Sequence, residues 1–261
     1  MSSALQNVLN QYPQLNVALE PYGLCAKTND EDARQLACIV RETPYIANNG
    51  VTIVTGALVN PNPIDRHITV DSYIEWVNGE LNNRGILTFI QNYSRQLITP
   101  LINLIQEYGI ALEAHMQNTI VNLGPNYQMN FIVRDLGGSR IDLNTLTHKL
   151  KNINVSNQSL LANSIEEVIA KFQHAVIQNQ LAELIHHFSK TEFVTEEELF
   201  TLVQDEVKLA INDNKPHAQA LKDVLFGSKI TVKALLRMRM SNRVKKYLNI
   251  ELDNPIRDEV R

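Results

Sequence analysis

Polar side chains with complementary chemistry lie close together in one part of this 261-residue sequence. The segment 113–118, EAHMQN, holds a glutamate, a histidine, a glutamine and an asparagine, and Arg134 and Asp135 follow two apolar runs later. A carboxylate can bind Mg²⁺, amides can bind phosphate oxygens, and an imidazole can donate to a developing anion. This composition predicts a site for a phosphorylated nucleotide and a metal ion.

Two short strands are needed to bring these side chains together. The apolar runs on either side of Gly124-Pro125-Asn126 predict such strands, because that tripeptide favours a tight turn. The resulting hairpin would place His115 and Asn118 near Asp135.

His115 is the first catalytic candidate, as a hydrogen-bond donor whose charge could balance a developing anion. Arg134 is the second, although it could either neutralise a substrate carboxylate or pair with Glu113. Glu113 itself is a candidate for contacting substrate or for orienting the site.

Three further side chains are predicted to bind the nucleotide. Asp135 lies at the end of a strand shortly before two glycines, which suits a Mg²⁺ ligand that bridges phosphates; the alternative is a turn-forming aspartate. Gln117 and Asn118 are nucleotide or metal contacts, or else local backbone caps. Arg41 and Glu42 directly follow an apolar strand, so they are either substrate contacts or a structural ion pair.

The EAHMQN segment followed by an Arg-Asp pair resembles the signature of the NRPS-independent siderophore synthetases, the family named after the aerobactin synthetases. Three more segments resemble that family in the same order, and together they cover most of the chain: LACIVRETPY at 36–45, TPLINLIQEYGIAL before the signature, and VKALLRMRM at 232–240 with a later Asn254-Pro255. By the same resemblance, Lys233 is a candidate for binding an anionic group of the nucleotide.

The resemblance covers only the C-terminal half of such a synthetase. The family's phosphate-binding segments, His-Pro…Lys…Gly-Phe-Ser and Ser-Ser-x-Arg-Thr, are not in this sequence, and residues 1–24 resemble the family's chain just after the second of them. We therefore expect one lobe of a larger enzyme, either part of a longer chain or separately encoded, with the N-terminal half as its missing partner.

The resemblance implies a reaction for the intact enzyme. It would use ATP and Mg²⁺ to activate a citrate-like polycarboxylate as an acyl-adenylate, and an amine or alcohol would then displace AMP. It would act as a homodimer, and its fold would resemble the family's palm-like lobe.

Two other interpretations remain open. The isolated lobe could be a non-catalytic module that binds ligand or dimerises. Alternatively, His-x-x-Asn followed by a strand and an aspartate loosely resembles kinase-like phosphotransferases, but Gln117 stands where the kinase catalytic aspartate would be, and no glycine-rich loop precedes it.

Composition narrows the class of protein. A net charge of −4 and an isoelectric point near 6.0 argue against nucleic-acid binding. Cys25 and Cys38 fit neither a zinc nor a redox motif. The sequence shows no signal peptide and no apolar run approaching the roughly 20 residues that span a bilayer. We expect a cytoplasmic protein.

Apolar periodicity predicts a mixed α/β (α+β), helix-rich fold with a small, mainly antiparallel sheet. We expect a mixed part at 1–142, carrying both motifs, and a helical part at 143–261 packed on it. All β structure is expected before Asp142, and 232–247 is expected to be a basic amphipathic helix. The other expected helices are one capped by Asp71, one at 86–108 kinked by Pro100 and ended by Gly109, and one at 164–188.

Overall fold

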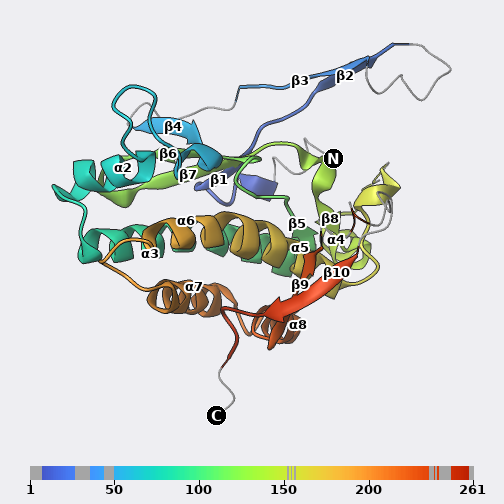
Figure 1. Ribbon diagram of the computed structural model, residues 1–261. Coiled ribbons are helices and arrows are strands. Elements are labelled where there is room, and N and C mark those ends of the chain that lie inside the picture. Colours follow the sequence, from blue (N-terminus) through green and yellow to red (C-terminus); the bar gives the residue numbers. More distant parts are fainter. Residues whose placement is uncertain are drawn as a thin grey trace.

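The computed structural model describes residues 8–26, 36–43, 50–151, 153, 155, 157–234, 238, 240 and 248–258. The fold is mixed α/β, as expected, with a sheet layer stacked on helices (Figure 1). Its strands are β1 (Leu15–Val17), β2 (Tyr22–Cys25), β3 (Ala37–Val40), β4 (Val51–Val54), β5 (Ile110–Ala111), β6 (Thr119–Leu123), β7 (Met129–Val133), β8 (Arg140–Ile141), β9 (Lys229–Lys233) and β10 (Asn249–Asp253). Its α-helices are α2 (Thr69–Asn78), α3 (Asn83–Tyr108), α4 (Leu143–Lys149), α5 (Ile165–Phe172), α6 (Ala182–Phe188), α7 (Glu196–Ala210) and α8 (Ala218–Leu225).

The main sheet has the strand order β1-β7-β6-β4. Strands β6 and β7 form the predicted hairpin, with Thr119 opposite Val133 and Leu123 opposite Met129. The turn closes through a hydrogen bond of 2.8 Å from the Gly124 amide to the Gln128 carbonyl. Strand β4 adds antiparallel to β6, and β1 adds parallel to β7. The sheet is therefore small and mainly antiparallel.

Helix α3 forms the centre of the helical layer under the sheet. Its 26 residues include Pro100, which the described helix accommodates without a break, and Gly109 ends it in the left-handed conformation (φ 64°) as predicted. Tyr93 of α3 meets Phe131 of β7 edge to face, with ring centroids 5.0 Å apart, and both are fully buried. The aromatic contact joins the two layers.

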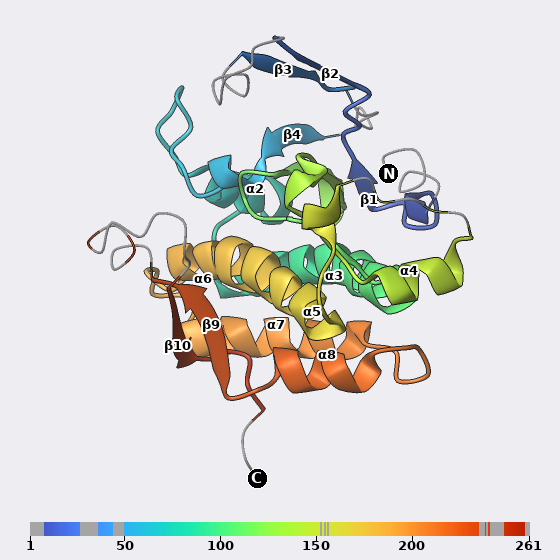
Figure 2. The same ribbon diagram turned by 90° about the vertical axis from the view of Figure 1, so that its right-hand side faces the viewer.

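Helices α5 and α7 begin at side-chain caps. Ser164 and Thr195 accept hydrogen bonds from the amides of Glu167 and Glu198, respectively. The helical stretch predicted at 164–188 is present as α5 and α6, joined by a π-helical segment at Gln173–Leu181. Figure 2 shows α5 and α6 lying across α3, with α7 and α8 beneath them.

The expected cap of α2 is wrong. Ile68 is the N-cap residue, and Asp71 lies inside the first turn. The Asp71 carboxylate instead meets the imidazole Nε2 of His187 on α6 at 2.7 Å. The side chain that local chemistry assigned to a cap therefore makes a tertiary hydrogen-bond contact instead.

The expectation that all β structure precedes Asp142 is also wrong. Residues 229–233 form β9, which pairs antiparallel with β10, so the expected helix at 232–247 does not begin at Val232. The sequence KITVK alternates polar and apolar residues and contains β-branched side chains, which favours a strand. Residues 241–247 of that expected helix lie outside the described part of the chain.

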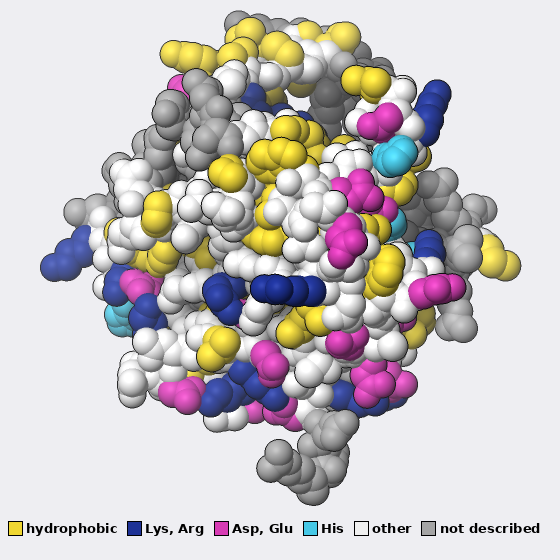
Figure 3. All heavy atoms as spheres, turned by 90° about the vertical axis from the view of Figure 1, so that its left-hand side faces the viewer, with side chains coloured by type: hydrophobic (Ala, Val, Ile, Leu, Met, Phe, Trp, Pro, Cys, Tyr) yellow, Lys and Arg dark blue, Asp and Glu magenta, His cyan; other side chains and the backbone are white. Residues whose placement is uncertain are grey.

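Strands β2 and β3 form a two-stranded ribbon that projects from the body (Figure 1). Tyr22, Leu24 and Ile39 are 69%, 66% and 60% exposed. Hydrophobic side chains therefore line the ribbon at the top of the molecule (Figure 3). Among the described helices, none is both long enough and apolar enough to cross a membrane.

Candidate functional site

One edge of the main sheet gathers the predicted site segments. The carboxyl ends of β1, β4 and β7 and the amino end of β6 meet there, because β1 is parallel to β7 while β6 is antiparallel to β7 and β4. The segment 113–118 leads into β6, and Arg134 and Asp135 follow β7. The amide of Arg134 donates to the carbonyl of Asn118 at 2.9 Å. The hairpin thus brings the two motifs side by side.

The segment 113–118, here called the site loop, is held to the end of β4 by hydrogen bonds to one of its backbone carbonyls. The hydroxyl of Thr55 and the amide of Gly56 both donate to the carbonyl of Met116, at 2.9 and 3.0 Å. Thr55 is fully buried at the end of β4. The loop is therefore fixed to the sheet at the residue directly after His115.

The imidazole of His115 is half-buried, and its Nδ1 accepts a hydrogen bond. The amide of Asn118 donates to Nδ1 at 3.3 Å. An Nδ1 that accepts carries no proton, so this contact favours the tautomer with the proton on Nε2. A donor on Nε2 is the form in which a histidine can bind an anionic oxygen.

The guanidinium of Arg134 is bound to the site loop. Its Nε and Nη2 donate to the carbonyl of Gln117 at 3.2 and 2.8 Å. The alternative that Arg134 pairs with Glu113 is wrong, because the Glu113 carboxylate pairs with the ammonium of Lys171 on α5. Arg134 therefore acts on the loop backbone in this structure.

Asp135 has an uncommon backbone conformation. Its φ of 59° and ψ of 70° lie in the left-handed region, which aspartate tolerates better than most residues. Its side chain is exposed and has no ion pair or hydrogen bond within the described part of the chain. Asn118, by contrast, is only 6% exposed. The carboxylate is thus open to a cation, and Asn118 is built into the sheet edge.

The chemistry of these donors can be compared with the needs of Mg²⁺. Among the described residues, no group of three or more His, Cys, Asp or Glu side chains could hold a metal. Magnesium in nucleotide enzymes is bound by one or two carboxylates together with substrate phosphates and water. A single unpaired Asp135 fits a metal delivered with a nucleotide.

Arg41 and Glu42 follow β3 and reach the same edge of the sheet. The amide of Glu42 donates to the carbonyl of Leu19, just beyond β1. The guanidinium of Arg41 donates to the carboxylate of Glu20, with Nε 3.0 Å from Oε1. In this structure Arg41 forms the structural ion pair that was the alternative expectation, with a partner that sequence reasoning did not single out.

Lys233 is the last residue of β9 and does not lie on a helix. Its side chain is outside the described part of the structure, so no contact with the sheet edge can be assigned to it.

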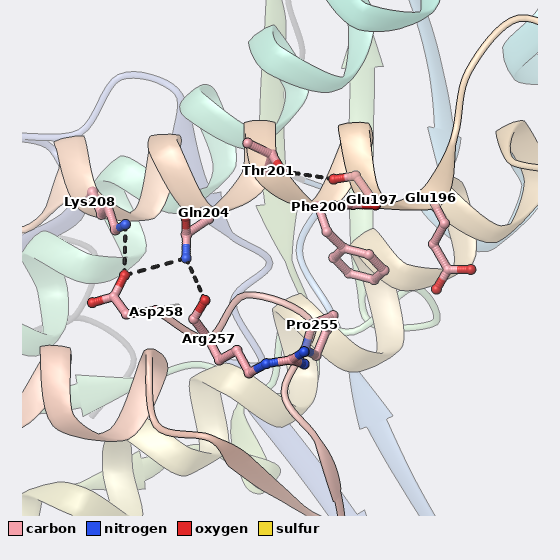
Figure 4. Close-up of a pocket in the computed structure, with 9 residues that line it drawn as sticks. All are labelled: Glu196, Glu197, Phe200, Thr201, Gln204, Lys208, Pro255, Arg257 and Asp258. Carbon is pink, nitrogen blue, oxygen red and sulfur yellow. Dashed lines mark hydrogen bonds and ion pairs between the residues drawn. The ribbon is translucent and has the colours of Figure 1, made fainter. Parts of the chain in front are cut away.

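Two hollows of the structure lie away from the predicted site residues. A groove of about 870 Å³ separates α7 from residues 255–258, with Phe200 at its wall and Lys208 paired to Asp258 (Figure 4). A second hollow of about 390 Å³ lies between α3, α4 and residues 215–217. Neither includes a residue of the predicted site.

Comparison with known proteins gives one family. A model described as "Ferric iron reductase FhuF-like transporter" matches residues 87–248. Staphyloferrin A synthase of Staphylococcus aureus is 61% identical over 260 residues, which cover 100% of this chain and 44% of that protein. Spermidine-citrate ligase of Bacillus anthracis is 24% identical over 100% of this chain and 45% of that protein. This chain therefore spans less than half the length of these relatives.

A solved structure shows the same fold. The ATP-bound aerobactin synthetase IucA of Klebsiella pneumoniae superposes with a TM-score of 0.79 and 17% identity, over 99% of this chain and 47% of that one. The match runs through the sheet and the helical layer together.

Proposed function

This chain belongs to the FhuF-like family, as the C-terminal domain of an NRPS-independent siderophore synthetase, and we propose that it supplies one wall of that enzyme's active site. The observation that carries the proposal is the sheet edge, which sets the site loop beside Asp135 in a chain that is 61% identical to staphyloferrin A synthase. The complete enzyme, termed the full-length synthetase below, is this sequence together with an N-terminal half of the kind its relatives carry.

The proposed reaction has two steps. A carboxylate oxygen of citrate or a similar polycarboxylate attacks the α-phosphorus of ATP, and pyrophosphate leaves as the bond from that phosphorus to the bridging oxygen breaks. An amine or hydroxyl then attacks the acyl carbon, loses its proton, and displaces AMP to give an amide or an ester. Both steps bring anions together, so catalysis depends on positioning and on offsetting charge.

The residues of the sheet edge would divide this work. His115 would donate from Nε2 to the carboxylate or to the phosphoryl oxygen as negative charge builds up. Asp135 would bind Mg²⁺, which supplies charge neutralisation at the phosphates. Gln117 and Asn118 would contact the nucleotide, and Lys233 would contact an anionic group of it.

The remaining candidates would act on the carboxylate substrate. Arg41 and Arg134 are the cations at this edge, and both are engaged, with Glu20 and with the Gln117 carbonyl. A polycarboxylate would have to compete for their guanidinium groups or bind alongside them. Glu42 is exposed beside Arg41 and is proposed to face the amine.

We also propose that the chain is organised as a mixed part at 1–142 and a helical part at 143–261, and that the full-length synthetase is a homodimer. The described hydrophobic core runs through both parts, from Leu15 on β1 to Leu225 on α8.

The family description mentions an iron reductase, but these residues do not favour one. An iron–sulfur cluster of the common type takes four cysteine thiolates. The sequence has two cysteines, Cys25 and Cys38, and both are exposed on the β2–β3 ribbon.

Product identification tests the proposal. The full-length synthetase, given Mg-ATP, citrate and hydroxylamine, should release AMP and pyrophosphate. Release of ADP and phosphate would instead support a kinase-like phosphotransferase, and citrate-independent products would contradict carboxylate activation.

A further inference from the structure

Glu113, the first residue of the site loop, is held from outside the loop. Its carboxylate pairs with the ammonium of Lys171, which lies 58 residues further along the chain on α5. The two side chains are only 25% and 14% exposed. A hydrogen bond between two charged groups with little water around them is stronger and more directional than a surface pair.

The same carboxylate rests directly on Gly138. A Cβ atom at Gly138 would overlap with both Oε2 and Cδ of Glu113. The φ of Gly138 is not in the left-handed region, so a substitution here would act by displacing the Glu113 carboxylate and not by straining the backbone. Gly138 ends the short turn Leu136–Gly138 that begins directly after Asp135.

One side chain therefore connects three segments. Glu113 belongs to the loop that carries His115, Gly138 belongs to the turn that starts at Asp135, and Lys171 belongs to a helix fixed in the core. The neighbours of Lys171 on α5, Ile169 and Phe172, are almost fully buried, so the helix gives the ammonium a fixed position.

We propose that Lys171 is a positioning residue, which holds Glu113 on Gly138 and thereby sets His115 and Asp135 at the spacing that carboxylate activation needs. This inference rests on the function proposed above. It also assigns Glu113 to orienting the site and not to binding substrate. Because the Lys171 ammonium is engaged by Glu113, its effect reaches the reaction through the loop.

Kinetics of the full-length synthetase would test the coupling. Lys171→Met and Glu113→Gln should each lower kcat by on the order of 10- to 100-fold, with a smaller change in the KM for citrate, because reacting groups are displaced and not removed. The double variant should be no slower than either single one, since both remove the same contact. Lys171→Arg should restore most of the rate.

A measurement independent of catalysis separates this inference from the proposed function. Hydrogen–deuterium exchange should become faster in peptides covering 113–118 and 134–139 in Lys171→Met and in Gly138→Ala, with peptides of α7 unchanged. Lys208→Met is the matched control, because Lys208 forms a similar but exposed pair with Asp258 beside α7. It should alter neither kinetics nor exchange at the site.

The proposed function and the positioning role of Lys171 predict different outcomes. A wild-type enzyme that makes no AMP would refute the proposed function while the exchange result still decides the role of Lys171. Unchanged exchange and rate in Lys171→Met, or additive losses in the double variant, would overturn the inference. If Lys171→Met fails to fold, Lys171→Gln and Gly138→Ala provide the same comparison.

Discussion

At the scale of single residues, the sheet edge contains groups engaged in hydrogen bonds and a carboxylate that is free of them among the described residues. The guanidinium of Arg134, the carbonyl of Met116 and Nδ1 of His115 are all used in hydrogen bonds within the sheet edge. The Asp135 carboxylate is unpaired among the described residues. On this division rests our proposal that His115 Nε2 and Asp135 carry the chemistry and that their neighbours support them.

Replacing His115 should therefore abolish catalysis without unfolding the protein. His115→Ala in the full-length synthetase should lower citrate-dependent pyrophosphate release by on the order of 100-fold or more, the usual effect of losing a positioned donor. Its thermal midpoint should stay close to that of the wild type, since the side chain is only half-buried. His187→Ala is the control and should show the reverse, because it breaks the contact with Asp71 but leaves the site intact. Pyrophosphate release at the wild-type rate would remove His115 from the mechanism.

Asp135→Asn should separate the effect of the carboxylate charge on Mg²⁺ binding from the effect of the backbone conformation at this position. Asparagine also tolerates the left-handed region, so the turn should persist while the carboxylate is lost. We expect the Mg²⁺ concentration for half-maximal pyrophosphate release to rise by about tenfold or more. A magnesium titration that superposes on the wild type would show that the metal is held elsewhere.

The sequence predicted the residues of the sheet edge better than their partners. The apolar runs and the Gly124-Pro125 turn were sufficient to predict the hairpin, because hairpins are local structures. Thr55 and Lys171 could not be predicted, since they meet the site loop across 61 and 58 residues of chain. Neither carries a local signal: Thr55 reads as a β-branched strand residue, and Lys171 as a solvated helix position.

At the scale of elements, glycines end the two helices α2 and α3, and α3 leads through β5 to the site loop. Gly109 has φ 64°, and a Cβ there would lie 2.8 Å from Cβ of Thr145 and 3.0 Å from the carbonyl oxygen of Asp142. Gly79, which ends α2 with φ 88°, has open space around its missing Cβ. The two helix ends share a left-handed backbone conformation, which would strain any other residue, but they differ in packing.

Gly109→Ala should cost more stability than Gly79→Ala. Strain alone should cost about 1 kcal/mol, and the added overlap should bring Gly109→Ala to roughly 2–4 kcal/mol. Urea unfolding of both variants measures the difference. Equal losses would mean that α4 moves away from Gly109 without penalty.

Helix α3 also ends in a charge cluster that should make stability depend on pH. The Lys215 ammonium, 2.7 Å from Oε1 of Glu107, lowers the pKa of that carboxyl from its ordinary value, with a smaller contribution from Lys149. A lowered folded-state pKa stabilises the fold above the ordinary pKa near 4.5, and this stabilisation is lost as pH falls through the folded value.

Glu107→Gln should therefore lower the thermal midpoint at pH 7, and the difference from the wild type should shrink as pH falls from about 5 towards 3. Differential scanning fluorimetry across this range measures it. Asp223→Asn is a suitable control, because Asp223 has a hydrogen bond with Gln219 but no ion pair among the described residues. A difference in thermal midpoint between wild type and Glu107→Gln that persists unchanged at pH 3 would show that the Glu107 carboxylate does not cause the pH dependence.

The C-terminal elements show the limit of local patterns. The sequence VKALLRM suits a helix, but Val232 and Lys233 pair with Ile250 and Asn249 in a strand ladder. A partner strand that lies some 17 residues further along overrides the local preference. Gly109, by contrast, was correctly predicted to end a helix, because a helix cap forms within a few residues of chain.

At the scale of the whole molecule, our proposal is that this chain supplies one wall of the active site. The sheet edge offers Asp135, the amides of the site loop and two engaged arginines, and the two hollows described above contain none of these residues. Mg-ATP brings four phosphate charges, and removing water from them without enough cations costs several kcal/mol. The lysine, serine and arginine donors that the synthetase resemblance assigns to the phosphates are in segments that these 261 residues do not contain.

Isothermal calorimetry with Mg-ATP, followed by a pyrophosphate assay with citrate and hydroxylamine, tests this account most directly when the 261-residue chain is compared with the full-length synthetase. The chain alone should bind Mg-ATP at least about a hundredfold more weakly, the equivalent of roughly 3 kcal/mol, and should form no product. The full-length synthetase should bind Mg-ATP and release pyrophosphate only when citrate is present. Tight binding with turnover by the 261-residue chain alone would contradict the account, because a complete site would then lie within it.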